Sequence, residues 1–148
     1  MYTYEYPRPA LTADIVLFNL DRTELLLIRR GNEPYKDHWA FPGGFFDMTD
    51  PNIEYTAARE LQEETGLANI PLQMVYVASR EGRDPRGRTV SVIFTANVDP
   101  STIEPRGGDD AAEARWWPVD ALPPLAFDHN EVLEHIIQPT DKIRHSTK

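Results

Sequence analysis

The sequence predicts an α+β fold in which helices cover a β-sheet, and three patterns support this prediction. Short apolar runs of strand length occur at residues 15–18, 25–28 and 74–78. Residues 90–98 alternate between apolar and polar side chains, and two helical patterns occupy residues 50–66 and 128–138. Strands, one long helix, further strands and a second helix favour a layered α/β or α+β sandwich. The length of 148 residues corresponds to about one domain, so we expect residues 1–148 to form a single domain.

The strand predictions rest on periodicity and turn chemistry. The runs at 15–18 and 25–28 are continuous and therefore typical of buried strands, and residues 19–23 between them indicate a hairpin turn. The alternation at 90–98 has a period of two, which favours a strand with one preferred face. Residues 115–117, followed by Pro118, are typical of a short edge strand.

The first helix is expected to begin at Asp50 as its N-cap, with Pro51 in the first helical position. Gly66 is expected to end it, because glycine readily adopts the left-handed conformation of a C-cap. Three residues are expected to form its core-facing side: Ala57, Ala58 and Leu61.

The second helix is expected to begin at Asp128, with Glu131 at the spacing of a capping box, and to end at Pro139. Its apolar residues fall on one side of the helix: Val132, Leu133, Ile136 and Ile137. The N-terminal arm at 1–8 and the tail at 140–148 are expected to be loosely ordered, as chain termini usually are.

Composition and charge exclude several classes of protein. The chain has 15 basic and 24 acidic residues, a net charge of −9, which disfavours nucleic acid and anionic lipid and suits divalent cations. It has no cysteine, which excludes disulfides, thiolate–zinc sites and cysteine nucleophiles. No apolar run approaches the ~20 residues that span a bilayer, and the N-terminus lacks a signal-peptide pattern. We therefore expect no membrane or nucleic-acid partner and a cytoplasmic location.

The segment from Gly43 to Leu67 concentrates the residues suited to chemistry. Glu60, Glu63 and Glu64 are spaced i, i+3 and i+4, so that a helix presents them on one face. Oxygen ligands crowded in this way suit Mg²⁺ or Mn²⁺, although a solvated acidic face is the alternative for the helix taken alone. Glycines 43 and 44 precede the helix and allow backbone to approach a ligand closely.

Residues 59–67, Arg-Glu-Leu-Gln-Glu-Glu-Thr-Gly-Leu, match the second half of the signature of the Nudix hydrolases, which this chain resembles. That signature runs glycine, five residues, glutamate, seven residues, then Arg-Glu-apolar-X-Glu-Glu-X-Gly-apolar. Here Asp50 replaces the first glutamate, and eight residues separate it from Arg59. The resemblance implies that an acid near this position holds the arginine. Asp47, Asp50 and Glu54 all remain open for this role, and Asp50 has the competing role of helix N-cap.

Other segments resemble the ADP-ribose pyrophosphatase branch of that family: 6–12, 29–34, 39–44, 83–91 and 114–129. The resemblance implies a Nudix-type α/β/α sandwich with a mixed β-sheet between helices. It also implies metal-dependent hydrolysis of a nucleoside diphosphate linked to a group X, here ADP-ribose giving AMP and ribose 5-phosphate.

The resemblance further implies roles for individual residues. The expected metal ligands are Gly44, Glu60, Glu63 and Glu64, with Mg²⁺ as the cofactor and Mn²⁺ as an alternative. The expected catalytic residues are Arg59, which orients the acids, Glu63, Glu64 and Glu113; the general base is either Glu64 or a loop acid at 109–113. The expected substrate-binding residues are Arg29, Arg30, Arg83, Arg88 and Phe46. The candidate aromatic surfaces for adenine are Trp39, Phe46, Trp116, Trp117 and Phe127.

Two alternative functions stay open. The first is a Nudix hydrolase for other nucleotides, such as oxidised nucleoside triphosphates, NADH or dinucleoside polyphosphates. The second is a sensor without catalysis, since regulators of NAD metabolism with similar motifs carry a winged-helix domain after the Nudix domain. Only ten residues follow Gln138, which we expect to leave no room for such a domain. The expected partner is a small nucleotide, and a homodimer formed through tyrosines 2, 4 and 6 remains open.

Overall fold

The computed structural model describes residues 3–108 and 111–137. Its elements are, in chain order, β1 (Ala10–Asn19), β2 (Glu24–Arg30), β3 (Trp39–Ala40), β4 (Gly43–Phe45), α1 (Ile53–Thr65), β5 (Gln73–Ala78), β6 (Thr89–Val98), a 3₁₀ turn (Pro100–Thr102), β7 (Ala111–Pro118) and α2 (His129–Ile136). Four predictions concern residues that the structure does not describe. They are the start of the N-terminal arm at 1–2, the end of the second helix at Pro139, the tail at 140–148, and the loop acids 109 and 110.

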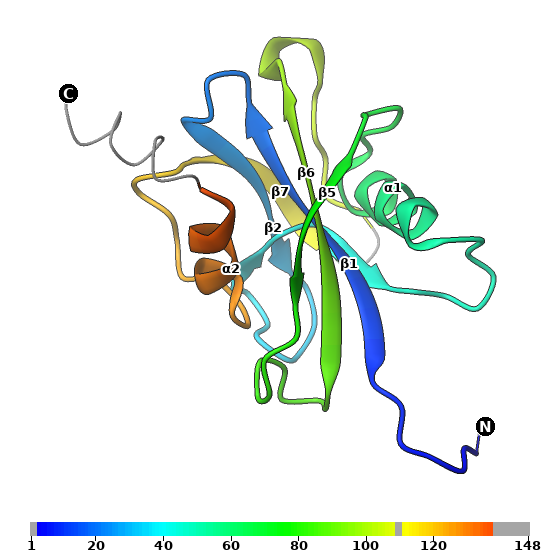
Figure 1. Cartoon of the computed structure of the whole chain (residues 1–148). Coiled ribbons are helices and arrows are strands. Elements are labelled where there is room, and N and C mark those ends of the chain that lie inside the picture. The colour runs from blue at the N-terminus through cyan, green and yellow to red at the C-terminus, as the bar shows by residue number, and fades with distance from the viewer. Residues whose placement is uncertain (1–2, 109–110, 138–148) are drawn as a thin grey trace.

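One mixed seven-stranded sheet organises the fold, with the order β3-β2-β1-β6-β5 and with β4 and β7 pairing to β1 and β2. The predicted hairpin of β1 and β2 is confirmed as an antiparallel pair, and β1 runs parallel to β6 along its whole length. Helix α1 lies on one side of the sheet and α2 on the other (Figure 1). The predicted α+β class, with a mixed sheet between helices, is therefore confirmed.

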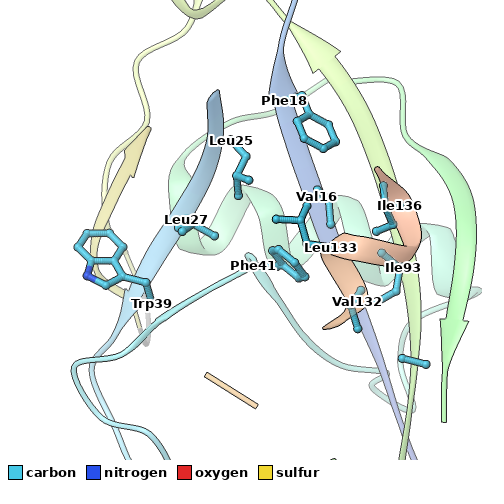
Figure 2. Close-up of a cluster of buried hydrophobic side chains, with 11 residues drawn as sticks. Val16, Phe18, Leu25, Leu27, Trp39, Phe41, Ile93, Val132, Leu133 and Ile136 are labelled. Carbon is cyan, nitrogen blue, oxygen red and sulfur yellow. The ribbon is translucent and has the colours of Figure 1, made fainter. Parts of the chain in front are cut away.

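Strand β1 is buried on both faces, because it lies in the middle of the sheet. Val16 and Phe18 pack with α2, in a cluster that Figure 2 shows together with residues from β2 and β6. Ile15 and Leu17 point to the opposite face and pack in the cluster that includes Leu61 of α1. Alternate residues of a strand point to opposite faces, so a continuous apolar run suits a strand covered on both sides.

Helix α1 begins later than expected. Its N-cap is Asn52, whose side chain accepts a hydrogen bond from the Tyr55 N–H, and Pro51 precedes the helix. The prediction that Asp50 caps the helix is therefore wrong, because its carboxylate binds Arg59 instead. Gly66, at φ 79°, ends the helix as predicted.

The core-facing side of α1 also differs from the prediction. Ala58 is exposed, whereas Thr56, Ala57 and Leu61 are buried. Glu64, predicted to lie on a face opposite the core, is buried with them at 7 % exposure. Because Glu64 follows Ala57 by two helical turns, it lies on the buried side of the helix, and the three acids are not equivalent.

Helix α2 starts at the predicted position, but Asp128 makes no side-chain cap hydrogen bond. Both oxygens of its carboxylate accept hydrogen bonds from Arg83 instead, each at 2.9 Å. Strand β7 is longer than the three residues predicted, and it pairs with β2 along its length. None of the helices in the described part of the chain is long and apolar enough to cross a membrane.

Candidate active site

A cleft of about 380 Å³ opens where α1, β1 and β4 meet. One wall is formed by Arg59, Glu60 and Glu64 of α1 together with the backbone of β4. Buried polar side chains of β1 and β6 form the floor, and the more exposed Phe45 of β4, Arg86 and Phe127 line the mouth. Strand pairing holds this geometry, since β4 lies antiparallel to β1 with Asp14 opposite Gly43.

Arg59 organises the acidic wall. Its guanidinium donates hydrogen bonds to Asp50 at 2.8 and 3.0 Å, to Glu60 at 2.7 Å and to Glu63 at 3.2 Å. A planar guanidinium offers five donors in a fixed fork, which lets one arginine fix several carboxylates at once. Hydrogen bonding to Asp50, and then to Glu60, raises the pKa of Arg59 above its usual value, so that it stays charged.

Asp50 holds the arginine, as the resemblance implied for an acid at this place. Its carboxylate also accepts from the Thr56 hydroxyl at 2.8 Å and from the Asp47 N–H at 3.0 Å. The hydrogen bonds from Arg59 are the main cause that lowers the pKa of Asp50 below its usual value. Of the three acids left open by the sequence, Asp50 is the one that contacts Arg59.

The three glutamates of α1 lie in different environments. Glu64 is buried and accepts a hydrogen bond from the Gly43 N–H at 2.8 Å. Burial raises the pKa of Glu64 to about 8, and the negative charges of Glu60 and Asp14 add to this effect against the Gly43 hydrogen bond. The side chain of Glu60 is 13 % exposed and lines the cleft, whereas that of Glu63 is 39 % exposed and contacts Arg59.

Two adjacent glycines let β4 approach the acids. A Cβ atom at Gly44 would lie 2.5 Å from the carboxyl carbon of Glu60, and one at Gly43 would overlap the backbone of Ala13 and Asp14. We expect Gly44→Ala to retain the fold, because the end of the Glu60 side chain can move, but to lower activity at least about tenfold by displacing that carboxylate. We expect Gly43→Ala to destabilise the fold. Steady-state kinetics and thermal melting of the two variants test this contrast, and a fully active Gly44→Ala would contradict it.

The residues of the acidic wall fit a divalent cation. Glu60 and Glu64 face one cleft beside Gly43 and Gly44 of β4, which have no side chains, and burial together with the charges of Glu60 and Asp14 raises the pKa of Glu64. Among residues 3–108 and 111–137, no three or more histidine, aspartate or glutamate side chains are grouped to hold one ion. Mg²⁺ is commonly bound through one or two carboxylates plus the phosphates of a substrate, so the pair suffices. Binding by Gly44, Glu60, Glu63 and Glu64 stays a prediction.

The structure brings some of the predicted substrate residues together. Arg30 and Arg83 line the cleft with Arg59, Glu60, Glu64 and Gly44. Arg29, the preceding residue in β2, points elsewhere and pairs with Asp37 at 2.9 Å and with Glu113 at 3.6 Å. Arg83 is itself only 6 % exposed, because Asp128 occupies its guanidinium.

Five predicted site residues do not line the cleft: Arg29, Arg88, Glu113, Phe46 and Glu63. Arg88 is exposed and lies 4.0 Å from Glu81. Phe46 is 38 % exposed, while its neighbour Phe45 lines the cleft. The reason is strand geometry, since adjacent residues of an extended chain point in opposite directions. Of the aromatic candidates, Trp39, Trp116 and Trp117 pack into or against the hydrophobic clusters, and Phe127 lines the cleft.

Four residues outside the expected site set also line the cleft: Asp14, Ser91, Phe45 and Arg86. At its mouth the Arg86 guanidinium lies 5.0 Å from the ring of Phe45 and 5.4 Å from that of Phe127, within range of cation–π attraction. At its floor are Asp14 and Ser91. A signal for Asp14 was present, because it is the charged residue in the otherwise uncharged strand β1.

His129 lines the cleft and is fixed by Phe41. The Phe41 N–H donates to its Nδ1 at 3.1 Å, and the imidazole stacks on the Phe41 ring at 4.4 Å. An Nδ1 that accepts a hydrogen bond carries no proton, so the ring is neutral. Burial lowers the pKa of His129 to about 3, with the charge of Asp128 opposing this shift.

This pKa predicts acid sensitivity. Because the folded pKa lies below the usual 6.5, the unfolded chain binds a proton that the folded chain does not, and stability falls as pH drops from 6.5 toward 3. The contribution is up to about 1.4 kcal/mol per pH unit. We expect the difference in unfolding free energy between pH 7 and pH 5, measured in urea, to be smaller in His129→Asn. His135→Asn, at an exposed position of α2, should match the wild type; equal pH dependence in both variants would contradict the prediction.

The fold and the cleft together define a layered domain in which an acidic helix, held by Arg59, lies beside the two glycines of β4. Residues 8–136 match the NUDIX domain, and the chain belongs to this family. The resemblance inferred from residues 59–67 is thereby confirmed, and members of the family generally use divalent metal ions.

Two sequence relatives and one solved structure show which members of the family this chain is similar to. The chain is 37% identical over 129 residues to an ADP-ribose pyrophosphatase of Methanocaldococcus jannaschii, covering 87% of this chain and 73% of that protein. It is 36% identical to an ADPR responsive transcriptional repressor of Acinetobacter baylyi, covering 88% of this chain but only 54% of the repressor. The NUDIX domain of Shewanella oneidensis NrtR, solved with ADP ribose, superposes with a TM-score of 0.80 at 31% identity, covering 88% of each chain.

Proposed function

We propose that this protein hydrolyses ADP-ribose to AMP and ribose 5-phosphate in a reaction that needs a divalent metal ion. The observation that carries the proposal is the pair Glu60 and Glu64, held by Arg59 and by the Gly43 N–H at one wall of the cleft. The M. jannaschii relative named as an ADP-ribose pyrophosphatase supports the choice of substrate. This is the reaction that the sequence resemblance implied.

Each residue of the acidic wall has its own role in the proposed reaction. Arg59 fixes Glu60 by direct hydrogen bonding, and Glu64 is fixed by the backbone of β4, so that neither acid needs to reorganise when substrate binds. A divalent ion held by Gly44, Glu60, Glu63 and Glu64 would neutralise phosphate charge and lower the pKa of a bound water. We assign Mg²⁺ to this place, with Mn²⁺ as the alternative.

The proposed reaction also needs a general base and residues that contact the substrate. Glu64 is preferred as base, because Glu113 lies outside the cleft lining and pairs with Arg29. Arg30 is the preferred arginine for the substrate phosphates, while Arg29, Arg83, Arg88 and Phe46 remain weaker candidates. Phe45, Phe127 and Arg86 at the mouth offer flat faces for adenine.

A second candidate function is an ADP-ribose sensor without catalysis. It is favoured by the likeness to the A. baylyi repressor and to the NrtR domain solved with ADP ribose. The presence of all three helix glutamates together with Arg59 supports hydrolysis over sensing. Hydrolysis of other nucleotides, including oxidised triphosphates, NADH and dinucleoside polyphosphates, remains the alternative within the enzyme class.

The test is a substrate panel with Mg²⁺, in which products are separated by chromatography. We expect the highest kcat/KM with ADP-ribose and release of AMP and ribose 5-phosphate in equal amounts. Binding of ADP-ribose by calorimetry with no hydrolysis of any pyrophosphate would overturn the proposal in favour of a sensor. A preference for triphosphates would assign the protein to another branch.

Four further proposals concern the domain organisation, the partners, the location and the oligomeric state of the protein. We propose a single domain, a small nucleotide as the partner, no binding of nucleic acid or membrane, and a cytoplasmic location. The net charge of −9 supports the absence of nucleic-acid and anionic-lipid partners. A homodimer remains open, and light scattering of the purified protein would decide it.

A further inference from the structure

A polar floor lies next to the acidic wall and is separate from the residues proposed to hold the metal ion and the phosphates. It consists of Thr12 and Asp14 of β1 and Ser91 of β6, which are 7, 8 and 2 % exposed and all line the cleft. Polar side chains buried to this degree are costly unless hydrogen bonds satisfy them. The floor is therefore built for polar contacts, either within the protein or with a ligand.

The hydrogen bonds within the floor leave Asp14 with acceptor capacity. Arg83 donates to the Ser91 hydroxyl at 2.7 Å, and that hydroxyl lies 2.5 Å from the Thr12 hydroxyl and also bonds to Asp14. The second neighbour of the Asp14 carboxylate is the Nε2 of His129, at 4.0 Å. A carboxylate can accept about four hydrogen bonds. Asp14 can thus accept further donors from a molecule in the cleft.

The charge of the floor disfavours phosphate there. The buried guanidinium of Arg83 donates two hydrogen bonds to the Asp128 carboxylate and a third to the Ser91 hydroxyl. Its positive charge is therefore already neutralised by Asp128 within the protein. The imidazole of His129 is neutral. A terminal phosphate at the floor would meet the Asp14 carboxylate, and the nearby cation Arg83 is already paired with Asp128, whereas hydroxyl groups would find acceptors.

The floor also lies at the right place for the group beyond the scissile bond. Asp14 is opposite Gly43 in the pairing of β1 with β4, and the Gly43 N–H donates to Glu64. The floor and the acidic wall are thus joined through one residue. A group attached directly to the pyrophosphate would reach the floor while the phosphates stay at the glutamates.

We propose that Asp14, supported by Ser91, is a specificity-determining residue that accepts hydrogen bonds from the hydroxyls of the group X and so selects an uncharged sugar over a terminal phosphate. This inference rests on the proposed function, because it places the pyrophosphate at Glu60 and Glu64. It gives the chain a physical basis for acting on a nucleoside diphosphate sugar rather than on a nucleoside triphosphate.

The test compares Asp14→Asn with wild type on two substrates, ADP-ribose and the methyl ester of ADP at its β-phosphate, which lacks the sugar. We expect kcat/KM for ADP-ribose to fall about 10- to 100-fold and that for the methyl ester to change less than about threefold. Ser91→Ala should show a smaller loss in the same direction. Asp99→Asn, which alters a half-buried carboxylate that does not line the cleft, serves as the matched control.

Equal loss on both substrates would overturn the inference, since Asp14 would then serve hydrolysis itself, and so would no loss on either. If Asp14→Asn fails to fold, Ser91→Ala alone decides by the same comparison. Calorimetric binding of both nucleotides in the Glu64→Gln background separates this inference from the proposed function. Tighter binding of ADP-ribose that Asp14→Asn removes would support the inference even if the wild type hydrolyses nothing. Equal affinity for the two nucleotides would overturn it.

Discussion

Glu64→Gln is expected to lower kcat/KM by about 10²- to 10⁴-fold, the largest loss among the acids of α1. The amide keeps the size of the side chain and can still accept the hydrogen bond from the Gly43 N–H. It removes the negative charge from the buried end of the acidic wall. The measurement is steady-state kinetics with ADP-ribose and Mg²⁺.

The same substitution should raise stability, which separates it from simple unfolding. Burial raises the pKa of Glu64 to about 8, so above this pH the folded protein without metal holds a carboxylate that would be better solvated in the unfolded chain. At pH 8.5 in a chelator we therefore expect a higher melting temperature for Glu64→Gln than for the wild type. Unchanged turnover would contradict the assignment of Glu64 to the site.

The loss of activity in Glu64→Gln can be compared with the effects of substituting two other glutamates of α1. Glu63→Gln should lose less activity than Glu64→Gln, because the Glu63 side chain is 39 % exposed and contacts the cleft only through Arg59. Glu54→Gln, at an exposed position in the first turn of α1, should retain wild-type activity. A loss as large in Glu54→Gln as in Glu64→Gln would show that the helix charge as a whole, rather than one buried acid, sets the rate.

Arg83→Met is expected to cost about 3–5 kcal/mol in the free energy of unfolding. The side chains of Arg83 and Asp128 are 4 and 7 % exposed and form two hydrogen bonds of 2.9 Å. Methionine fills much of the volume but leaves the Asp128 carboxylate buried without its cation. Urea unfolding at pH 7 provides the measurement.

The chain offers a matched control in the same loop between β5 and β6. Arg80 pairs with Glu131 at 2.8 Å, but the two side chains are 61 and 57 % exposed, so Arg80→Met should cost at most about 1 kcal/mol. The double substitution Arg83→Met with Asp128→Asn should recover part of the loss, because it removes the uncompensated charge. Similar costs for Arg83→Met and Arg80→Met would contradict a structural role for the buried pair.

Sequence-based reasoning was most successful where a local pattern has a single physical meaning. The apolar runs of β1 and β2 could be predicted because both faces of a central strand are covered. The string from Arg59 to Leu67 identified the family, because its spacing brings acids and an arginine onto one helix. Gly66 marked the end of that helix through its backbone conformation.

Reasoning from sequence failed where one side chain had two competing partners. Aspartate is a residue type that commonly caps helices, and Asp50 and Asp128 stand where the sequence predicts helix N-termini. In the structure, however, Asp50 accepts hydrogen bonds from Arg59, and Asp128 accepts them from Arg83. An arginine offers each carboxylate two parallel hydrogen bonds together with an opposite charge, and the arginine that does so is known only once the chain has folded.

The sequence by itself determined the family, the two helices, the central strands and the acids of α1, because these depend on spacing along one element. Only the tertiary structure decided which acid is buried, which of Arg29 and Arg30 reaches the cleft, and that Asp14 and Ser91 lie beside the glutamates. Those outcomes depend on the parallel pairing of β1 with β6 and the antiparallel pairing of β1 with β4. Pairing between distant segments is set by the packing of the whole chain, which no local pattern contains.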